Sequence, residues 1–205
     1  MKKYFLISLS ALVICACGNK TETANSAAEI KTTNDSVIAT PVTKPLKSIE
    51  PEGVLGIIEI PEILTLAVKD SAKQEDIGFL MGKAYNLIES DMRELGLHTN
   101  DMPAGALYYN NDPKNFIFEC VVPIDKMPAK QPKHSTIVVL EATKAVVYNY
   151  YGPYDKMFNA YGILQTYLKD NKLEQSGVAR EFYLSDPTVE KDPNNWLSKI
   201  YIPVK

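Results

Sequence analysis

The segment Val178–Pro187 contains the residues whose types and spacing could do chemistry. It has the pattern of a short strand, in which alternation places Glu181 and Tyr183 on the same face. Their neighbours Arg180 and Phe182 point the other way, and an Asp-Pro pair ends the segment, as is typical of a turn. A carboxylate in mid-strand among aromatic residues is either a solvent-facing charge or a charge held in a ligand-binding cleft.

Other chemistry has little support in the sequence. The two histidines, His98 and His134, are not spaced from another His or Cys as metal ligands are. No phosphate-binding or dinucleotide-binding glycine pattern occurs, and no Gly-x-Ser-x-Gly motif. Cys120 lies in an apolar segment and is typical of a buried, unreactive thiol. We therefore expect no metal and no cofactor.

An internal repeat organises the elements that must position Glu181. Residues 81–88 align with residues 157–164 at a constant offset, and both segments have helical periodicity, with Tyr85 over Tyr161. A strand precedes each helix, at 63–68 and 143–150. After each helix comes a strand with a Tyr and then Asp-Pro, followed by a strand ending in a similar Val-Pro or Ile-Pro pattern.

The repeat predicts an α+β fold, a tandem βαββ unit with pseudo-two-fold symmetry. Its halves are expected at about 55–124 and 137–205. One such unit cannot cover its own sheet, so the two should pack together. We expect an antiparallel sheet with the helices on one side and a ligand groove on the other. In this alignment Leu107 takes the place of Glu181, so the carboxylate belongs to one half only.

The first 52 residues have a different composition from the rest of the 205-residue chain. Lys2 and Lys3 precede an apolar run that is too short to span a bilayer but is typical of a signal peptide, which we expect at 1–16. Residues 17–52 are rich in small and polar residues and predict a disordered tether. A single folded domain is expected at 53–205. The formal net charge is −3 and no basic patch occurs, so nucleic-acid binding is not expected.

The sequence Ile14-Cys15-Ala16-Cys17 resembles the lipobox of bacterial lipoproteins. That resemblance implies cleavage before Cys17, a diacylglyceryl thioether on its sulfur, and acylation, for example with palmitate, of the new N-terminus. Several acyl chains anchor a protein stably. We thus expect a lipid-anchored protein of the cell envelope, periplasmic or surface-exposed; the alternative is an ordinary signal peptide with a chance cysteine.

Residues 148–155, 180–187, Trp196 and 201–204 together resemble the GyrI-like small-molecule-binding domain, the effector-binding domain of AraC- and MerR-type regulators. The resemblance covers about residues 55–205 and implies the same tandem βαββ fold. It also implies that a groove between the halves binds amphipathic, often cationic, molecules. Glu181 matches the family's recognition glutamate, and its pKa should be raised by desolvation when the groove is empty.

The expected ligand-binding residues combine this match with the surrounding aromatic residues. They are Glu181, Tyr183, Trp196, Tyr109, Phe118 and Tyr150. The family often has His where this chain has Asn149 or Tyr150, which puts any role for an imidazole there in doubt.

Three functions remain open from the sequence. We expect a monomeric envelope protein that binds a small amphipathic, cationic molecule, with aromatic faces adding cation–π attraction. The first alternative is a hydrolase of electrophilic, cyclopropane-bearing compounds, as some stand-alone members of the family are, with Glu181 as general base. The second is an interaction protein of the cell envelope.

Overall fold

The computed structural model describes residues 51–205 of the chain. The predicted signal peptide, Cys17 and all but the last two residues of the predicted tether lie outside the described residues.

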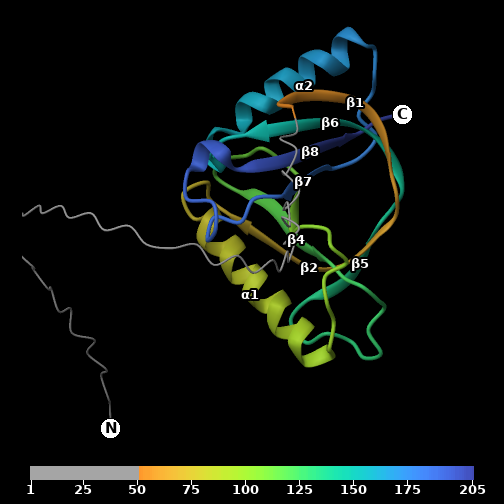
Figure 1. Ribbon diagram of the computed structural model, residues 1–205, viewed down its shortest axis with the longest axis vertical. Coiled ribbons are helices and arrows are strands. Elements are labelled where there is room, and N and C mark those ends of the chain that lie inside the picture. The colour runs from red at the N-terminus through yellow and green to blue at the C-terminus, as the bar shows by residue number, and fades with distance from the viewer. Residues whose placement is uncertain (1–50) are drawn as a thin grey trace, which may run out of the picture. The chain divides into compact units, whose positions relative to one another are not determined.

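The described chain forms one eight-stranded sheet with two α-helices (Figure 1). The strand order is β1-β6-β8-β7-β3-β4-β2-β5, and every neighbouring pair is antiparallel. The strands are β1 (Gly53–Ile60), β2 (Ile63–Ala72), β3 (Gly105–Tyr108), β4 (Phe116–Pro123), β5 (Thr136–Leu140), β6 (Thr143–Tyr151), β7 (Ala179–Tyr183) and β8 (Leu197–Pro203). The helices are α1 (Ile77–Leu95) and α2 (Phe158–Asp170), and two 3-10 turns occur at η1 (Tyr154–Lys156) and η2 (Pro193–Asn195).

The predicted α+β fold and its tandem repeat are confirmed. The units β2-α1-β3-β4 and β6-α2-β7-β8 have the same order of elements, and β3 pairs with β7 in the middle of the sheet. This central pair joins the two halves into one continuous sheet.

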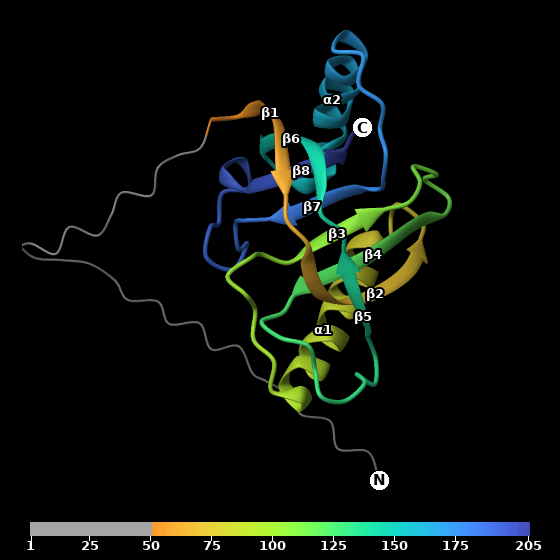
Figure 2. The ribbon, with the colours of Figure 1, turned by 90° about the vertical axis from the view of Figure 1, so that its right-hand side faces the viewer.

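Two edge strands were not expected from the sequence, and they cross between the halves. β1 precedes the first unit but pairs with β6 of the second, while β5 precedes the second unit but pairs with β2 of the first. The strand order places both at the ends of the sheet, and Figure 2 shows β1 beside β6 and β5 beside β2. Each half therefore completes the sheet of the other.

The strand register corrects the alignment of the two halves around Glu181. Pro123 and Pro203 end β4 and β8, and the residues two places before them, Val121 and Tyr201, pair with Gly105 and Arg180. Gly105 thus corresponds to Arg180, which makes Ala106 the counterpart of Glu181 and Tyr108 the counterpart of Tyr183. The prediction that Leu107 takes the place of Glu181 is wrong by one residue, and a one-residue shift moves a side chain to the other face of the sheet.

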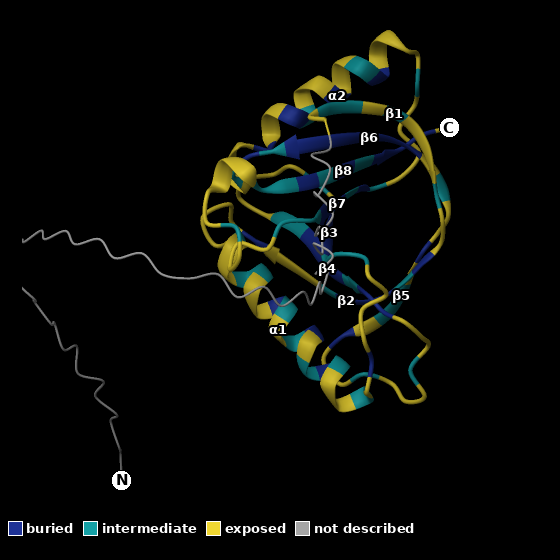
Figure 3. Cartoon of the chain, in the orientation of Figure 1, coloured by how far each residue is buried: buried dark blue, intermediate teal, exposed yellow. Residues whose placement is uncertain are grey.

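Both helices cover the same face of the sheet and bury separate cores against it (Figure 3). α1 packs through Ala84 and Ile88 on β2 and β4, and α2 packs through Ala160 and Leu164 on β6, β7 and β8. α1 ends at Gly96, whose φ of 62° is left-handed and costs glycine little. Within residues 51–205, neither helix has the length and apolar character needed to cross a membrane.

The opposite face carries a third, smaller core. Its buried members are Ile63, Ala67, Leu107, Val121, Leu140 and Phe182. Leu107 and Phe182 come from the two central strands, so this core also spans the junction between the halves.

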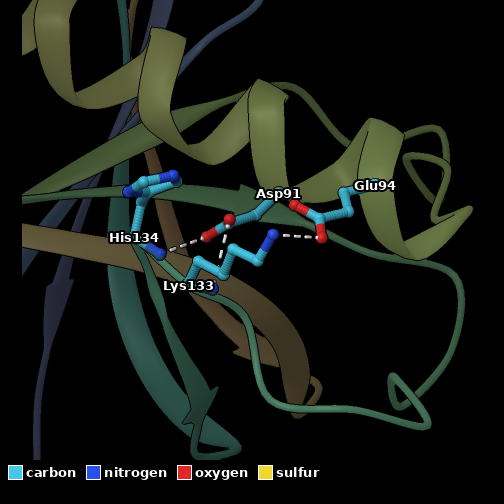
Figure 4. Close-up of polar contacts among 4 residues, drawn as sticks. All are labelled: Asp91, Glu94, Lys133 and His134. Atoms are coloured by element: carbon cyan, nitrogen blue, oxygen red, sulfur yellow. Dashed lines mark hydrogen bonds and ion pairs between the residues drawn. The ribbon is translucent and has the colours of Figure 1, made fainter.

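The segment that connects the halves is fastened to α1 by Asp91. Its side chain is 1% exposed and accepts hydrogen bonds from the backbone N–H groups of Lys133, His134 and Ser135 and from the Ser135 hydroxyl, at 2.7–3.2 Å. Figure 4 shows the carboxylate facing this segment, with Lys133 also reaching Glu94 at 2.5 Å. Burial raises the pKa of Asp91, but these hydrogen bonds outweigh burial and lower the pKa below its ordinary value.

Candidate functional site

Glu181 lies on the central strand β7, on the face that the helices cover. It is 5% exposed, and its neighbours across the sheet are Ala106 on β3 and Ile200 on β8. Tyr161 of α2 donates a hydrogen bond to Oε1 at 2.6 Å, and Tyr183 donates to Oε2 at 3.0 Å. The carboxyl group is therefore held between the sheet and α2.

Four tyrosines form two symmetry-related pairs around this carboxyl group. Tyr108 and Tyr183 are counterparts on β3 and β7, and their hydroxyl oxygens lie 3.1 Å apart. Tyr85 and Tyr161 are counterparts on the helices; Tyr161 binds Glu181, whereas Tyr85 donates to the Gly105 carbonyl at 2.7 Å. These tyrosines occur in both halves of the repeat. The carboxylate occurs in one half only, because Ala106 is the counterpart of Glu181.

The surroundings of Glu181 make its carboxyl group easier to protonate than that of an exposed glutamate. Burial raises the pKa of Glu181 to about 7, although hydrogen bonds from Tyr161, Tyr183 and Tyr108 oppose the rise. The expected raised pKa is thus confirmed. Burial and the negative charge of Glu181 also raise the pKa of Tyr161, so its hydroxyl remains protonated and can donate.

No positively charged side chain within residues 51–205 balances the ionised form of Glu181. Glu181 forms no ion pair there, and neutral tyrosine hydroxyls are its hydrogen-bond donors. A buried ionised carboxylate without a positive partner is costly, so such a group is kept neutral or paired with a charge from outside.

Trp196 joins the site through an intervening aromatic residue. The ring of Tyr154 lies 4.9 Å from Trp196 and 5.1 Å from Tyr183, at tilted angles. Trp196 Nε1 donates to the Glu190 carbonyl at 2.9 Å, which orients the indole. The predicted residues Tyr183 and Trp196 are thus linked to Glu181 in one aromatic chain.

The other predicted aromatic residues have different surroundings. Tyr150 is buried beside α2 and donates to the Pro153 carbonyl at 2.9 Å. Phe118 is fully buried in the core under α1. Tyr109 lies on the opposite face of the sheet, where its hydroxyl donates a hydrogen bond to Glu119. Lys69 Nζ lies over the Tyr109 ring, 3.4 Å from the ring centre. The structure does not bring Tyr109 to Glu181.

Tyr85, Tyr108, Tyr161 and Tyr154 were missed as site residues. The signal was present in the repeat, because Tyr85 aligns with Tyr161. Helical periodicity accounts for an apolar residue at these positions but not for a hydroxyl in both copies. A duplicated tyrosine where leucine would pack equally well indicates that the hydroxyl is used.

Glu181 does not lie where the groove was expected. The groove was expected on the face opposite the helices, whereas Glu181 and its partners lie on the helix face. Cavities of about 480 and 490 Å³ lie elsewhere, one along α2 and β1 and the other beside Lys73 and Pro113. Glu181 lines neither, since the tyrosines cover it.

Metal binding has no support in this part of the chain. Within residues 51–205, no group of three or more His, Cys, Asp or Glu side chains is placed to hold a metal ion. The site offers one carboxyl group and several neutral hydroxyls, a donor set suited to recognising a single positive charge.

The comparison with protein families gives one match. The model described as the GyrI-like small molecule binding domain matches residues 56–205. No curated protein matches the chain.

Several solved structures share the fold. The C-terminal domain of EcmrR is 23% identical, with a TM-score of 0.66 over 73% of this chain and 95% of that one. SAV2435 bound to tetraphenylphosphonium is 16% identical, with a TM-score of 0.53 over 73% and 92% of the two chains. A hydrolase from Listeria innocua is 14% identical, with a TM-score of 0.52 over 73% and 90%.

Proposed function

Because the chain belongs to the GyrI-like small-molecule-binding domain family, we propose that it binds a small amphipathic cation, with Glu181 as the counter-charge. The observation that carries this proposal is the buried carboxyl group, which neutral tyrosines surround and no cation of the described chain neutralises. The structural similarity to SAV2435, which was solved with the lipophilic cation tetraphenylphosphonium, supports the same ligand class.

The aromatic residues around Glu181 supply the apolar part of the site. A lipophilic cation that reaches Glu181 has to displace the tyrosine rings covering it, and it then gains cation–π contacts with their faces. The chain Tyr183–Tyr154–Trp196 extends this aromatic surface outward to Tyr154, which is 38% exposed. Entry at Tyr154 would place the charged centre at Glu181 and the apolar groups against the rings.

Tetraphenylphosphonium titrated into the purified domain tests the proposal by isothermal calorimetry. We expect wild type to bind and Glu181→Gln to bind about ten- to a hundredfold more weakly, because the negative counter-charge of the buried cation is lost. Glu119→Gln is the matched control, since Glu119 is also buried and bonded to a tyrosine but lies on the other face. No binding by wild type, or equal binding by Glu181→Gln, would refute the proposal.

The proposed location is the cell envelope, with the domain anchored by lipid on Cys17. The lipobox-like segment before Cys17 supports this, because several acyl chains on one residue anchor a protein stably. Labelling the full chain with palmitate in bacteria tests it. Wild type should incorporate label and fractionate with membranes, and Cys17→Ala should do neither. Absence of label from wild type would remove the anchor from the proposal.

A second candidate function is hydrolysis, which is supported by the raised pKa of Glu181. A carboxyl group with a pKa of about 7 beside Tyr161 and Tyr183 hydroxyls is suited to act as a general base towards water. The fold is shared with a hydrolase from Listeria innocua. Turnover of an electrophilic, cyclopropane-bearing compound by wild type, lost in Glu181→Gln and kept in Glu119→Gln, would establish it; binding without turnover by wild type would reject it.

A further inference from the structure

Ser198 of β8 is a buried polar group that the site described so far does not use. Its side chain is fully buried, and its hydroxyl has no hydrogen-bond partner within residues 51–205. A buried hydroxyl without a partner is unfavourable, and such groups in folded proteins call for an explanation. Serine can both donate and accept, so a ligand with either kind of group could satisfy it.

Ser198 lies next to Tyr183, the residue of the aromatic chain that is bonded to Glu181. It shares the helix-covered face with Ile200 and Ile202 of the same strand. Its direct neighbours across the sheet are Tyr183 on one side and Tyr150 on the other.

The distance from Glu181 follows from the register. Glu181 pairs with Ile200, and Ser198 is the next residue of β8 on that face. Diagonal neighbours of this kind lie about 7–8 Å apart in an antiparallel pair. A ligand whose charge rests at Glu181 can therefore reach Ser198 with a polar group attached to the far end of a phenyl ring.

We infer that Ser198 is a specificity-determining residue, which hydrogen-bonds a hydroxyl or similar polar group on one aromatic arm of the bound cation. This inference rests on the proposed function and narrows its ligand class. The preferred ligand is a lipophilic monocation with a polar group displaced from its charge, rather than a purely hydrocarbon cation. Sites that hydrogen-bond a ligand hydroxyl discriminate strongly against analogues without it, because their own polar group is then left unpaired.

Two phosphonium ions of nearly equal shape provide the test. The cation (4-hydroxymethylphenyl)triphenylphosphonium carries a hydroxyl where (4-ethylphenyl)triphenylphosphonium carries a methyl group. Wild type should bind the hydroxyl compound about three- to tenfold more tightly than its isostere, as one hydrogen bond allows. Ser198→Ala should abolish that ratio, whereas Ser71→Ala, an exposed serine on β2, should keep it.

Stability gives a second, independent readout. Ser198→Ala without ligand should melt at the wild-type temperature or above, because the hydroxyl it removes has no partner. A melting temperature lower by several degrees would show that the hydroxyl is already bonded in the free protein and would overturn the inference.

The outcomes distinguish failure of the role of Ser198 from failure of the proposed cation site at Glu181. If both cations bind wild type and need Glu181, but the affinity ratio is the same in Ser198→Ala, the role of Ser198 is refuted and the cation site stands. If neither cation binds wild type, the proposed function itself fails.

Discussion

At the scale of single residues, the protein keeps one carboxyl group in surroundings that suit its neutral form. Glu181 accepts hydrogen bonds from Tyr161 and Tyr183, but these do not offset the loss of water, and its pKa rises to about 7. The folded state therefore holds a proton on Glu181 that the unfolded chain releases at lower pH. This difference makes both stability and binding depend on pH.

The stability of the free domain should fall as pH rises from about 4.5 to about 7. A carboxyl pKa that is raised by folding favours the folded state below the unfolded pKa, and this contribution is lost as pH rises through the folded pKa. Glu181→Gln should remove this loss and be more stable than wild type at pH 8, by on the order of 3 kcal/mol. Urea unfolding at pH 5 and pH 8 measures it. Glu119→Gln is the control. If Glu181→Gln and Glu119→Gln both kept the wild-type dependence of stability on pH, the assignment would be contradicted.

Binding of a cation should release a proton at pH 6. The resting carboxyl group is mostly protonated there, and the cation selects the ionised form. Calorimetric titration of tetraphenylphosphonium in two buffers of different ionisation enthalpy should give different heats for wild type. Below pH 7 the affinity should fall by up to tenfold per pH unit. Equal heats in the two buffers would show that Glu181 does not ionise on binding.

At the scale of elements, the segment joining the halves depends on one side chain of α1. Asp91 satisfies three consecutive backbone N–H groups and a hydroxyl, so a single carboxylate fixes residues 133–135 against the helix. β5 begins directly afterwards, at Thr136. The start of the edge strand β5 is therefore positioned by a side chain of α1, which packs on the face of the sheet.

Asp91→Ala should cost about 3 kcal/mol of unfolding free energy, because several buried donors lose their acceptor at once. The control is Glu94→Ala, whose ion pair with Lys133 is exposed and should contribute less than about 1 kcal/mol. Chemical unfolding of both variants gives the values. A loss for Asp91→Ala no larger than for Glu94→Ala would contradict the role of this carboxylate.

At the scale of the whole molecule, the central pair of β3 and β7 has room for no side chain at Gly105. A Cβ there would lie 2.8 Å from the ring of Phe182 and closer still to the backbone carbonyl oxygen of Glu181. The two halves therefore approach each other at van der Waals distance through a glycine, directly beside the strand that carries the site.

Gly105→Ala should destabilise the domain by about 2–3 kcal/mol and weaken cation binding, since a rigid backbone atom has to move. Gly82→Ala is the matched control: it lies exposed within α1, where an added Cβ meets nothing within 4 Å, and it should stabilise by about 0.5–1 kcal/mol. Thermal melts compare the two. Equal melting temperatures would show that a Cβ at residue 105 is accommodated without strain between β3 and β7.

The fold could be predicted from the sequence because duplication is visible in local patterns. The helices containing Tyr85 and Tyr161, and the strands after them, repeat in order and in residue type. β1 and β5 could not be identified in this way, because their partners β6 and β2 belong to the other half. The choice of Leu107 in place of Ala106 failed because strand register depends on pairing, which a linear alignment does not contain.

Of the residues that cluster around Glu181, the sequence points to Tyr183 and Trp196 but not to those on the helices. Glu181, Tyr183 and Trp196 lie on neighbouring strands and could be found from alternation and from family resemblance. Tyr161 comes from a helix packed above them, and its contact depends on helix orientation rather than on sequence spacing. Ser198 carries no signal of its own, since an isolated serine in a strand is ordinary until its burial is known.

The exchange of edge strands has a consequence for how the chain folds. Gly53 at the start of β1 pairs with Asn149, so the first strand of residues 51–205 has its partner almost a hundred residues later. Contacts of such long range slow folding, because the connecting chain must be ordered before they form. Neither half can complete its sheet alone, so the ligand site and the fold should appear together, in one cooperative step.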